Sequence, residues 1–82
     1  MDKQTILTEI AQIMKEYFDD EGLTLTPETT AQDVAGWDSL NHVNIVAAVE
    51  QHFKIRFLMA EVEGLHRVGD LVDLVAAKLA KT

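Results

Sequence analysis

The chain has 82 residues, the length of a single domain, residues 1–82, and 48% of them are hydrophobic, enough to build one core. Its 14 acidic residues outnumber 7 Lys and Arg and give a net charge of −7, which argues against nucleic acid as a partner because the phosphates would be repelled. With no cysteine, a polar start unlike a signal peptide, and no apolar run near the roughly 20 residues of a membrane helix, a soluble cytoplasmic protein is expected, without disulfides or membrane insertion.

The first predicted element is an amphipathic helix over residues 4–18. Apolar side chains recur there at spacings of three and four residues, which is the period of one helix face. They are Ile6, Ile10, Ile13 and Tyr17, with Leu7, Met14 and Phe18 beside them. Three acidic residues and Gly22 follow, and Gly22 is the expected end of the helix because glycine tolerates the left-handed conformation found there.

Residues 23–37 form a long predicted loop. Its sparse apolar residues are Leu23, Leu25, Val34 and Trp37. The polar run PETTAQD, which starts at Pro27, could hold one turn of helix. A loop of about 15 residues is unusual in so small a domain, and loops of this length tend to be functional or to wrap the core.

A second helix is expected from Asp38 or Ser39 to about Phe53. Its predicted apolar face consists of Leu40, Val43, Val46, Ala47, Val49 and Phe53, and the polar Asn41, Asn44, Glu50 and Gln51 are expected mostly on the other side. A short helix of one or two turns follows in the segment LMAEVEGL, where Met59, Val62 and Leu65 have helical spacing.

The last predicted helix runs from about Gly69 to Ala80. Its inward residues are Leu71, Val72, Val75, Ala76 and Leu79. Asp70 stands in its first turn, and Lys78 and Lys81 stand in its last, where their charges complement the helix dipole. No segment alternates as a strand would. The predicted fold is all-α: a small four-helix bundle of three long helices and one short helix, with a long loop between the first and second.

The polar residues exclude several kinds of site. Neither residues 19–22 nor residues 33–38 have the acid spacing of an EF-hand loop. His42, His52 and His66 form no His-Glu-x-x-His pattern, so no metal site is expected. A Ser-His-Asp hydrolase can be assembled on paper, but a bundle this small offers little pocket in which to orient its groups.

Ser39 is the residue that most needs an explanation. Asp and Ser are both preferred at helix starts, where their oxygens accept free backbone N–H bonds. Asp38 is the expected cap, and Ser39 then falls one position inside the helix, where its hydroxyl is not needed for capping. The N–H groups and positive dipole end at such a position stabilise a phosphate. Ser39 is therefore a candidate anchor for a phosphodiester-linked group.

At this point the sequence resembles a known family. The segment WDSLNHVNIVAAVEQHFKI is similar to acyl carrier proteins, whose motif is Asp-Ser-Leu at the start of the second helix. Three further features match in the same order, and with the helix lengths they extend the resemblance over nearly the whole chain. They are the pair Asp33-Val34, the series Phe53-x-Ile55-x-Phe57, and the segment Val68-Gly69-Asp70-Leu71.

The resemblance implies a carrier and not a catalyst. A phosphopantetheinyl transferase would attach 4′-phosphopantetheine from coenzyme A to Ser39, beside the motif residue Asp38. Acyl groups would be held on the arm's thiol as thioesters, supplied by a loading ligase or acyltransferase and delivered to synthase or transferase enzymes. A monomer is expected. In the family the acyl chain can also lie among the helices, and the residues that could line that space or simply pack in the core are Val43, Val46, Val62 and Leu65.

The chain also departs from the family pattern. In carriers of fatty acid synthesis the second helix is densely acidic, whereas the corresponding positions here include Asn41, Asn44, Gln51 and His52. This favours a carrier for a dedicated lipid or secondary-metabolite pathway over the housekeeping carrier. The hypothesis is that partners recognise it by apolar contact and a few charges, at Trp37, Leu40, Glu50, Met59 and Glu61. For Trp37 the alternative is an anchor that packs the loop on the bundle.

Other functions remain open at this level. Aspartate before the serine favours acyl cargo, because peptidyl carriers more often have histidine there, but it does not exclude an aminoacyl cargo. A small acidic interaction module would use Ser39 only at the helix start. A small hydrolase would use it as a nucleophile.

Overall fold

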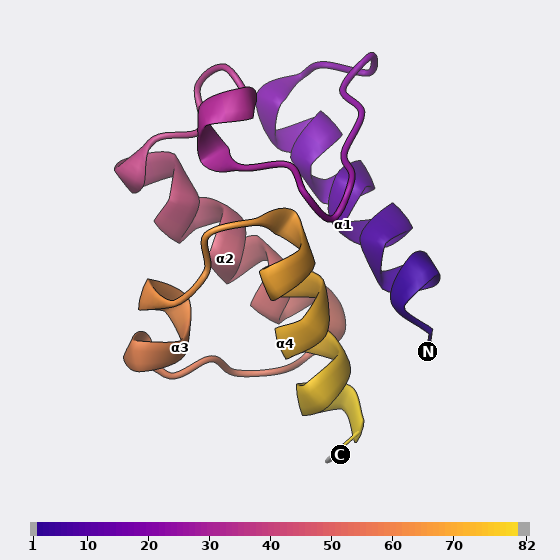
Figure 1. The fold of residues 1–82 in the computed structure, drawn as a ribbon, viewed down its shortest axis with the longest axis vertical. Helices are drawn as coiled ribbons and strands as arrows, with labels where there is room; N and C mark the ends of the chain where they lie inside the picture. Colours follow the sequence, from indigo (N-terminus) through magenta and orange to yellow (C-terminus); the bar gives the residue numbers. More distant parts are fainter. Residues whose placement is uncertain (1, 81–82) are drawn as a thin grey trace.

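The computed structural model describes residues 2–80 and is an all-α bundle, as predicted (Figure 1). Its elements are α1 (Lys3–Phe18), the 3₁₀ turn η1 (Ala31–Asp33), α2 (Ser39–Phe53), α3 (Met59–Glu63) and α4 (Val68–Ala80). The three long helices, the short one and the long first loop are confirmed. The 3₁₀ turn lies within the run PETTAQD, where one turn was expected. The predicted place of Lys81 in the last turn lies outside the described residues.

Helix α1 buries one stripe and ends earlier than Gly22. Asp2 caps its start, because the Asp2 carboxylate accepts the backbone N–H of Thr5 at 2.7 Å. Ile6, Ile10 and Met14 face the core, whereas Tyr17 is 39% exposed. The helix terminates at Asp19, whose φ of 52° and ψ of 48° are left-handed. Aspartate tolerates that conformation better than most residues, so Gly22 was the wrong helix end.

Helix α2 carries two apolar stripes, whereas the sequence pattern assigned their residues to a single apolar face. Ile45, Val46, Val49 and Phe53 are buried, but Leu40 and Val43 are 74% and 60% exposed, and Ala47 is exposed as well. The inward assignment of Leu40, Val43 and Ala47 was therefore wrong. These three residues are spaced by three and four and share a face of their own, which points away from the buried one. Periodicity detects such a face but does not reveal whether it meets the core.

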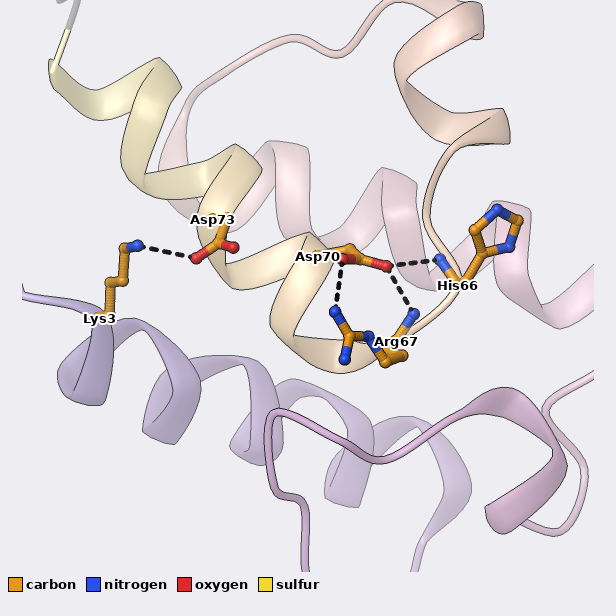
Figure 2. A network of polar contacts seen from close by, with 5 residues as sticks. All are labelled: Lys3, His66, Arg67, Asp70 and Asp73. Atoms are coloured by element: carbon orange, nitrogen blue, oxygen red, sulfur yellow. Dashed lines mark hydrogen bonds and ion pairs between the residues drawn. The ribbon is translucent and has the colours of Figure 1, made fainter.

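Helix α4 begins at Val68, one residue before the predicted start, and Asp70 fixes that beginning. The Asp70 carboxylate accepts the backbone N–H of His66 at 3.1 Å and that of Arg67 at 3.0 Å (Figure 2). These two bonds, with the nearby Arg67 guanidinium, lower the pKa of Asp70 below its usual range. At the other end, Lys78 pairs with Glu61 of α3 at 2.9 Å, which joins the short helix to α4.

The long loop wraps the core and is fastened to the start of α4. Its residues Leu25, Val34 and Trp37 are each less than 10% exposed and belong to the same buried cluster as the helices. The N–H groups of Val68 and Gly69 donate to the carbonyls of Thr29 and Pro27, both at 2.8 Å. A Cβ on Gly69 would lie 2.8 Å from the Pro27 oxygen, so only glycine fits this contact without movement.

Candidate functional site

Ser39 is the first residue of α2, and its side chain is exposed. Asp38 caps the helix, as expected, with its Oδ1 accepting the backbone N–H of Asn41 at 2.9 Å. The capping role is thus filled by the preceding residue. The Ser39 hydroxyl is left at the positive end of a 15-residue helix, which is a favourable position for a group bearing a phosphate.

The loop before Ser39 is held by its own backbone geometry. Gly36 has a φ of 86°, in the left-handed region that glycine occupies without strain. Its carbonyl accepts two hydrogen bonds, from the Asp38 N–H at 3.1 Å and from the Asn41 side-chain amide. The turn that presents Asp38 and Ser39 is therefore tied to the first turn of α2.

A hydrogen-bond network joins this turn to α1. The Tyr17 hydroxyl donates to Asn41 Oδ1 at 2.7 Å and accepts from Asn44 Nδ2 at 3.1 Å. Asn41 and Asn44 are two of the positions where the sequence resemblance would have allowed acids. Here both side chains bind the hydroxyl of Tyr17 at the protein surface. The sequence did not reveal this network; the hydroxyl of Tyr17, on an otherwise apolar stripe, was the only signal.

Trp37 and His42 form a pair beneath the helix start. The Trp37 Nε1–H donates to His42 Nδ1 at 3.1 Å, and the two rings stack with centroids 5.9 Å apart. Trp37 is only 8% exposed, so it is placed as a loop anchor, one of its two alternatives. Most of the indole is out of reach of a docking protein.

This pair also argues against a hydrolase. In a serine triad the histidine Nδ1–H donates to a carboxylate, which leaves Nε2 free to accept the serine proton. Here His42 Nδ1 accepts a bond from an indole, which is a donor only. The neutral ring then carries its proton on Nε2 and has no lone pair to activate Ser39.

A pocket of about 340 Å³ lies beside Ser39. Its lining residues are Ala31, Trp37, Asp38, Ser39, His42, Leu65, His66, Arg67 and Leu71. Leu65 was expected to line an acyl space or pack in the core, and it lines this pocket. The other three residues of that expectation lie elsewhere: Val46 is buried, Val62 is half-buried, and Val43 is exposed.

The residues predicted to meet partners fall into two groups. Leu40 and Met59 are 74% and 76% exposed, and Val43 and Leu58, which the hypothesis did not include, are also exposed. The two predicted acids, Glu50 and Glu61, form the second group, and their carboxylates accept backbone N–H groups of the protein itself. Glu50 Oε2 accepts the Phe57 N–H at 2.8 Å, and Glu61 accepts the Leu58 N–H at 2.7 Å in addition to its pair with Lys78.

The residues around Ser39 fit a 4′-phosphopantetheine group. An exposed hydroxyl at a helix N-terminus suits its phosphate, and an adjoining pocket with apolar walls suits the uncharged part of the arm. Within residues 2–80, no three His, Cys, Asp or Glu side chains gather as metal ligands. None of the helices in that range has the length and apolar character needed to span a bilayer.

Comparison with known proteins agrees with this geometry. Residues 4–75 match the family described as "Phosphopantetheine attachment site". The chain is 37% identical over 76 residues to the acyl carrier protein of Acidothermus cellulolyticus, covering 93% of this chain and 90% of that one. It is 28% identical over 81 residues to the acyl carrier protein of Saccharopolyspora erythraea, covering 99% and 85%.

Solved structures give the same likeness. The solution structure of the holo acyl carrier protein from Geobacter metallireducens aligns with a TM-score of 0.86 and 45% identity, over 93% of this chain and 87% of that one. The crystal structure of the acyl carrier protein from Thermotoga maritima also gives a TM-score of 0.86, with 26% identity over 99% and 94%.

Proposed function

We propose that Ser39 carries the 4′-phosphopantetheine arm of this chain, which belongs to the acyl carrier protein family. The chain is an acyl carrier, and its prosthetic group is a covalently attached 4′-phosphopantetheine. When bound, that group supplies the thiol on which acyl groups are held as thioesters. The attachment residue is the part that needs a proposal.

The observation that carries this assignment is the position of the hydroxyl. Ser39 is exposed at the first residue of α2, while Asp38 performs the capping. It is also the only serine in the chain, so a serine-linked arm has no other place. The free N–H groups of the first helical turn and the helix dipole stabilise the phosphate of the attached group.

The protein's own residues then act by presentation. The bonds from Asp38 and Asn41 to the Gly36 carbonyl hold the loop, and the Tyr17 network holds that loop against α1. A fixed loop presents one exposed hydroxyl to a phosphopantetheinyl transferase and later presents the loaded arm. The family is one of carriers, and we propose that this chain likewise catalyses no reaction itself.

We further propose that partners dock on an apolar patch beside the arm. This patch, called here the docking patch, consists of Leu40, Val43, Leu58 and Met59, all at least 60% exposed. Exposed apolar side chains near a functional residue are typical of an interaction site. Leu40 and Val43 follow Ser39 on the first turns of α2, and Leu58 and Met59 stand at the start of α3. The partners would be the loading ligase or acyltransferase and the synthase or transferase that uses the cargo.

The reduced acidity of α2 supports a carrier for a dedicated pathway. Glu50 is the only acid within α2, and its carboxylate binds the Phe57 N–H. A partner whose basic surface binds a densely acidic helix would meet few negative charges on α2. The cytoplasmic location and the monomeric state remain predictions, and an aminoacyl cargo remains the alternative to an acyl one.

The direct test is intact mass after incubation with coenzyme A and a broad-specificity phosphopantetheinyl transferase. The wild type should gain the mass of one phosphopantetheine, and Ser39→Ala should gain none. Circular dichroism on both proteins establishes that the variant is folded. If folded wild-type protein gained nothing, or Ser39→Ala gained the same mass, the assignment would be wrong, and an unmodified interaction module would become the better account.

A further inference from the structure

Nε2 of His42 is a buried hydrogen-bond group without a partner. Among residues 2–80 it is the only buried side-chain nitrogen or oxygen in that condition. Leaving a buried donor unsatisfied is costly, and buried polar groups in native proteins nearly always have a partner. Such an atom beside the attachment serine needs an explanation that the proposed function does not give.

The tautomer of this ring is set by Trp37. Indole Nε1–H can only donate, so His42 Nδ1 must accept, and the neutral ring carries its hydrogen on Nε2. The stacking of the two rings at an interplanar angle of 27° holds the imidazole in place. Nε2 is therefore a fixed donor that requires an oxygen or nitrogen acceptor.

The position of His42 on α2 brings it next to the arm. His42 lies three residues after Ser39, so both are neighbours on one helix face. It also continues the buried series Val46, Val49 and Phe53 at spacings of four, three and four, which turns its ring toward the protein. Both His42 and Ser39 line the 340 Å³ pocket, and because Nε2 itself is covered, a neighbouring side chain must shift before an acceptor in the pocket reaches it.

The walls of the pocket distinguish the acceptors that the arm offers. Trp37, Leu65 and Leu71 are apolar side chains. A hydrated phosphate anion brought against Nε2 would therefore lose much of its hydration, which is costly. The Asp38 carboxylate lies on the same pocket and would repel it. A neutral amide carbonyl meets neither penalty. Arg67, with 57% of its side chain exposed, leaves a cation on the outer side, where the phosphate can remain.

We propose that His42 Nε2–H donates to an amide carbonyl of the phosphopantetheine arm and so docks the inner part of the arm in this pocket. Trp37 acts through His42 by fixing its tautomer and is a positioning residue. This inference rests on the attachment of the arm to Ser39. It adds that the arm has a preferred binding position in this pocket and that the His42 imidazole determines the bound fraction of the arm.

The test uses NMR on the apo and holo forms of the ¹⁵N-labelled protein. In the holo wild type, the His42 Nε2–H resonance should move, an amide carbonyl of the arm should shift, and the ³¹P resonance should be the same in wild type and His42→Phe. Nuclear Overhauser contacts should join the arm to Trp37 or Leu65. A holo form in which Nε2–H is unchanged, or in which the phosphorus responds to His42 instead of the carbonyl, would overturn the proposal.

Matched variants separate the donor from the ring. His42→Phe keeps an aromatic ring but no donor, and it should lower the docked fraction of the arm roughly 2- to 10-fold, the equivalent of one ordinary hydrogen bond. His42→Gln restores an N–H donor at a similar distance from the backbone and should recover part of the docking. His52→Gln, at a histidine that bonds Glu9 and lies outside this pocket, should leave docking unchanged. Equal docking in wild type and folded His42→Phe would contradict the proposal.

The mass of each sample separates this inference from the function beneath it. If the wild type accepts no arm, the attachment itself fails. If wild type and His42→Phe both accept one arm and their NMR signatures of the arm agree, the attachment stands and only the role of His42 is rejected.

Discussion

The Tyr17 hydroxyl donates to Asn41 Oδ1 at 2.7 Å, across 24 residues of sequence. Asn41 also binds the Gly36 carbonyl, so this contact connects the end of α1 to the turn that presents Ser39. The network uses a position where an acid would otherwise attract basic partners. The neutral Asn41 adds no charge to this surface, and its hydrogen bonds hold the loop in place.

Tyr17→Phe should loosen that turn. The ring contact with Phe18 is retained, while the bonds to Asn41 and Asn44 are lost. Because the site is partly exposed, we expect the free energy of unfolding to fall by only about 0.5–1 kcal/mol. Amide hydrogen exchange at residues 36–38 should accelerate. Unchanged exchange there, with α1 intact, would show that the network does not restrain the loop.

Gly69→Ala should damage the contact between the long loop and α4. The new Cβ would stand 2.8 Å from the Pro27 carbonyl oxygen, and the backbone must move to relieve the clash. We expect a loss of about 1–3 kcal/mol in urea unfolding, the usual cost of overpacking. Gly22→Ala is the control, since its Cβ would meet only Asp20 Oδ1, at 3.6 Å. Equal stability of the two variants would contradict the account of this contact.

The Asp70 carboxylate should make stability depend on pH at the acid end. The N–H bond from His66 is the largest cause of its lowered pKa, followed by that from Arg67. A carboxyl whose pKa is lower in the folded state contributes stability above its unfolded pKa and loses it as the pH falls through the folded value. Asp70→Asn should therefore cost most near neutrality and little at strongly acidic pH. A cost independent of pH would contradict the role of the charge.

Leu40→Ala and Met59→Ala should weaken partner docking without unfolding the carrier. Both side chains are largely exposed, so each change should alter stability by no more than about 0.5 kcal/mol. If they are central to the docking patch, the KM for the holo carrier with its partner enzyme should rise about 5- to 30-fold.

Thr24→Ala, on the exposed part of the loop outside the patch, is the control for the docking patch. Charge reversal at Glu50 or Glu61 is a poorer test, because both carboxylates bind backbone N–H groups and their loss would disturb the fold. A KM unaffected by either apolar change would reject the docking patch.

The sequence predicted the fold because its helix signals are local. The apolar spacing of Ile6, Ile10 and Ile13 and the cap Asp38 need only neighbouring residues to be recognised. Which stripe of α2 faces the core is not local. Leu40 and Val43 have the same period as the buried residues, and only the packing of the other helices decides that they stay outside.

The site was predictable to the same extent. Ser39 stood out because Asp38, the residue before it, is the expected helix cap. The serine hydroxyl is then not needed for capping. The bonds of Tyr17 to Asn41 and of Trp37 to His42 join side chains whose meeting depends on loop conformation. Helix α1 ending at Asp19 and not at Gly22 has a similar reason, since several residues in that stretch can adopt the left-handed conformation.

The most direct measurement is fragmentation mass spectrometry of the protein after it has been loaded by a phosphopantetheinyl transferase. The account predicts a single phosphopantetheine on the peptide that contains Ser39, located to that residue, and none on any peptide of folded Ser39→Ala. A modification located to another residue, or a folded wild type that is never modified, would contradict the claim that Ser39 is where this carrier holds its arm.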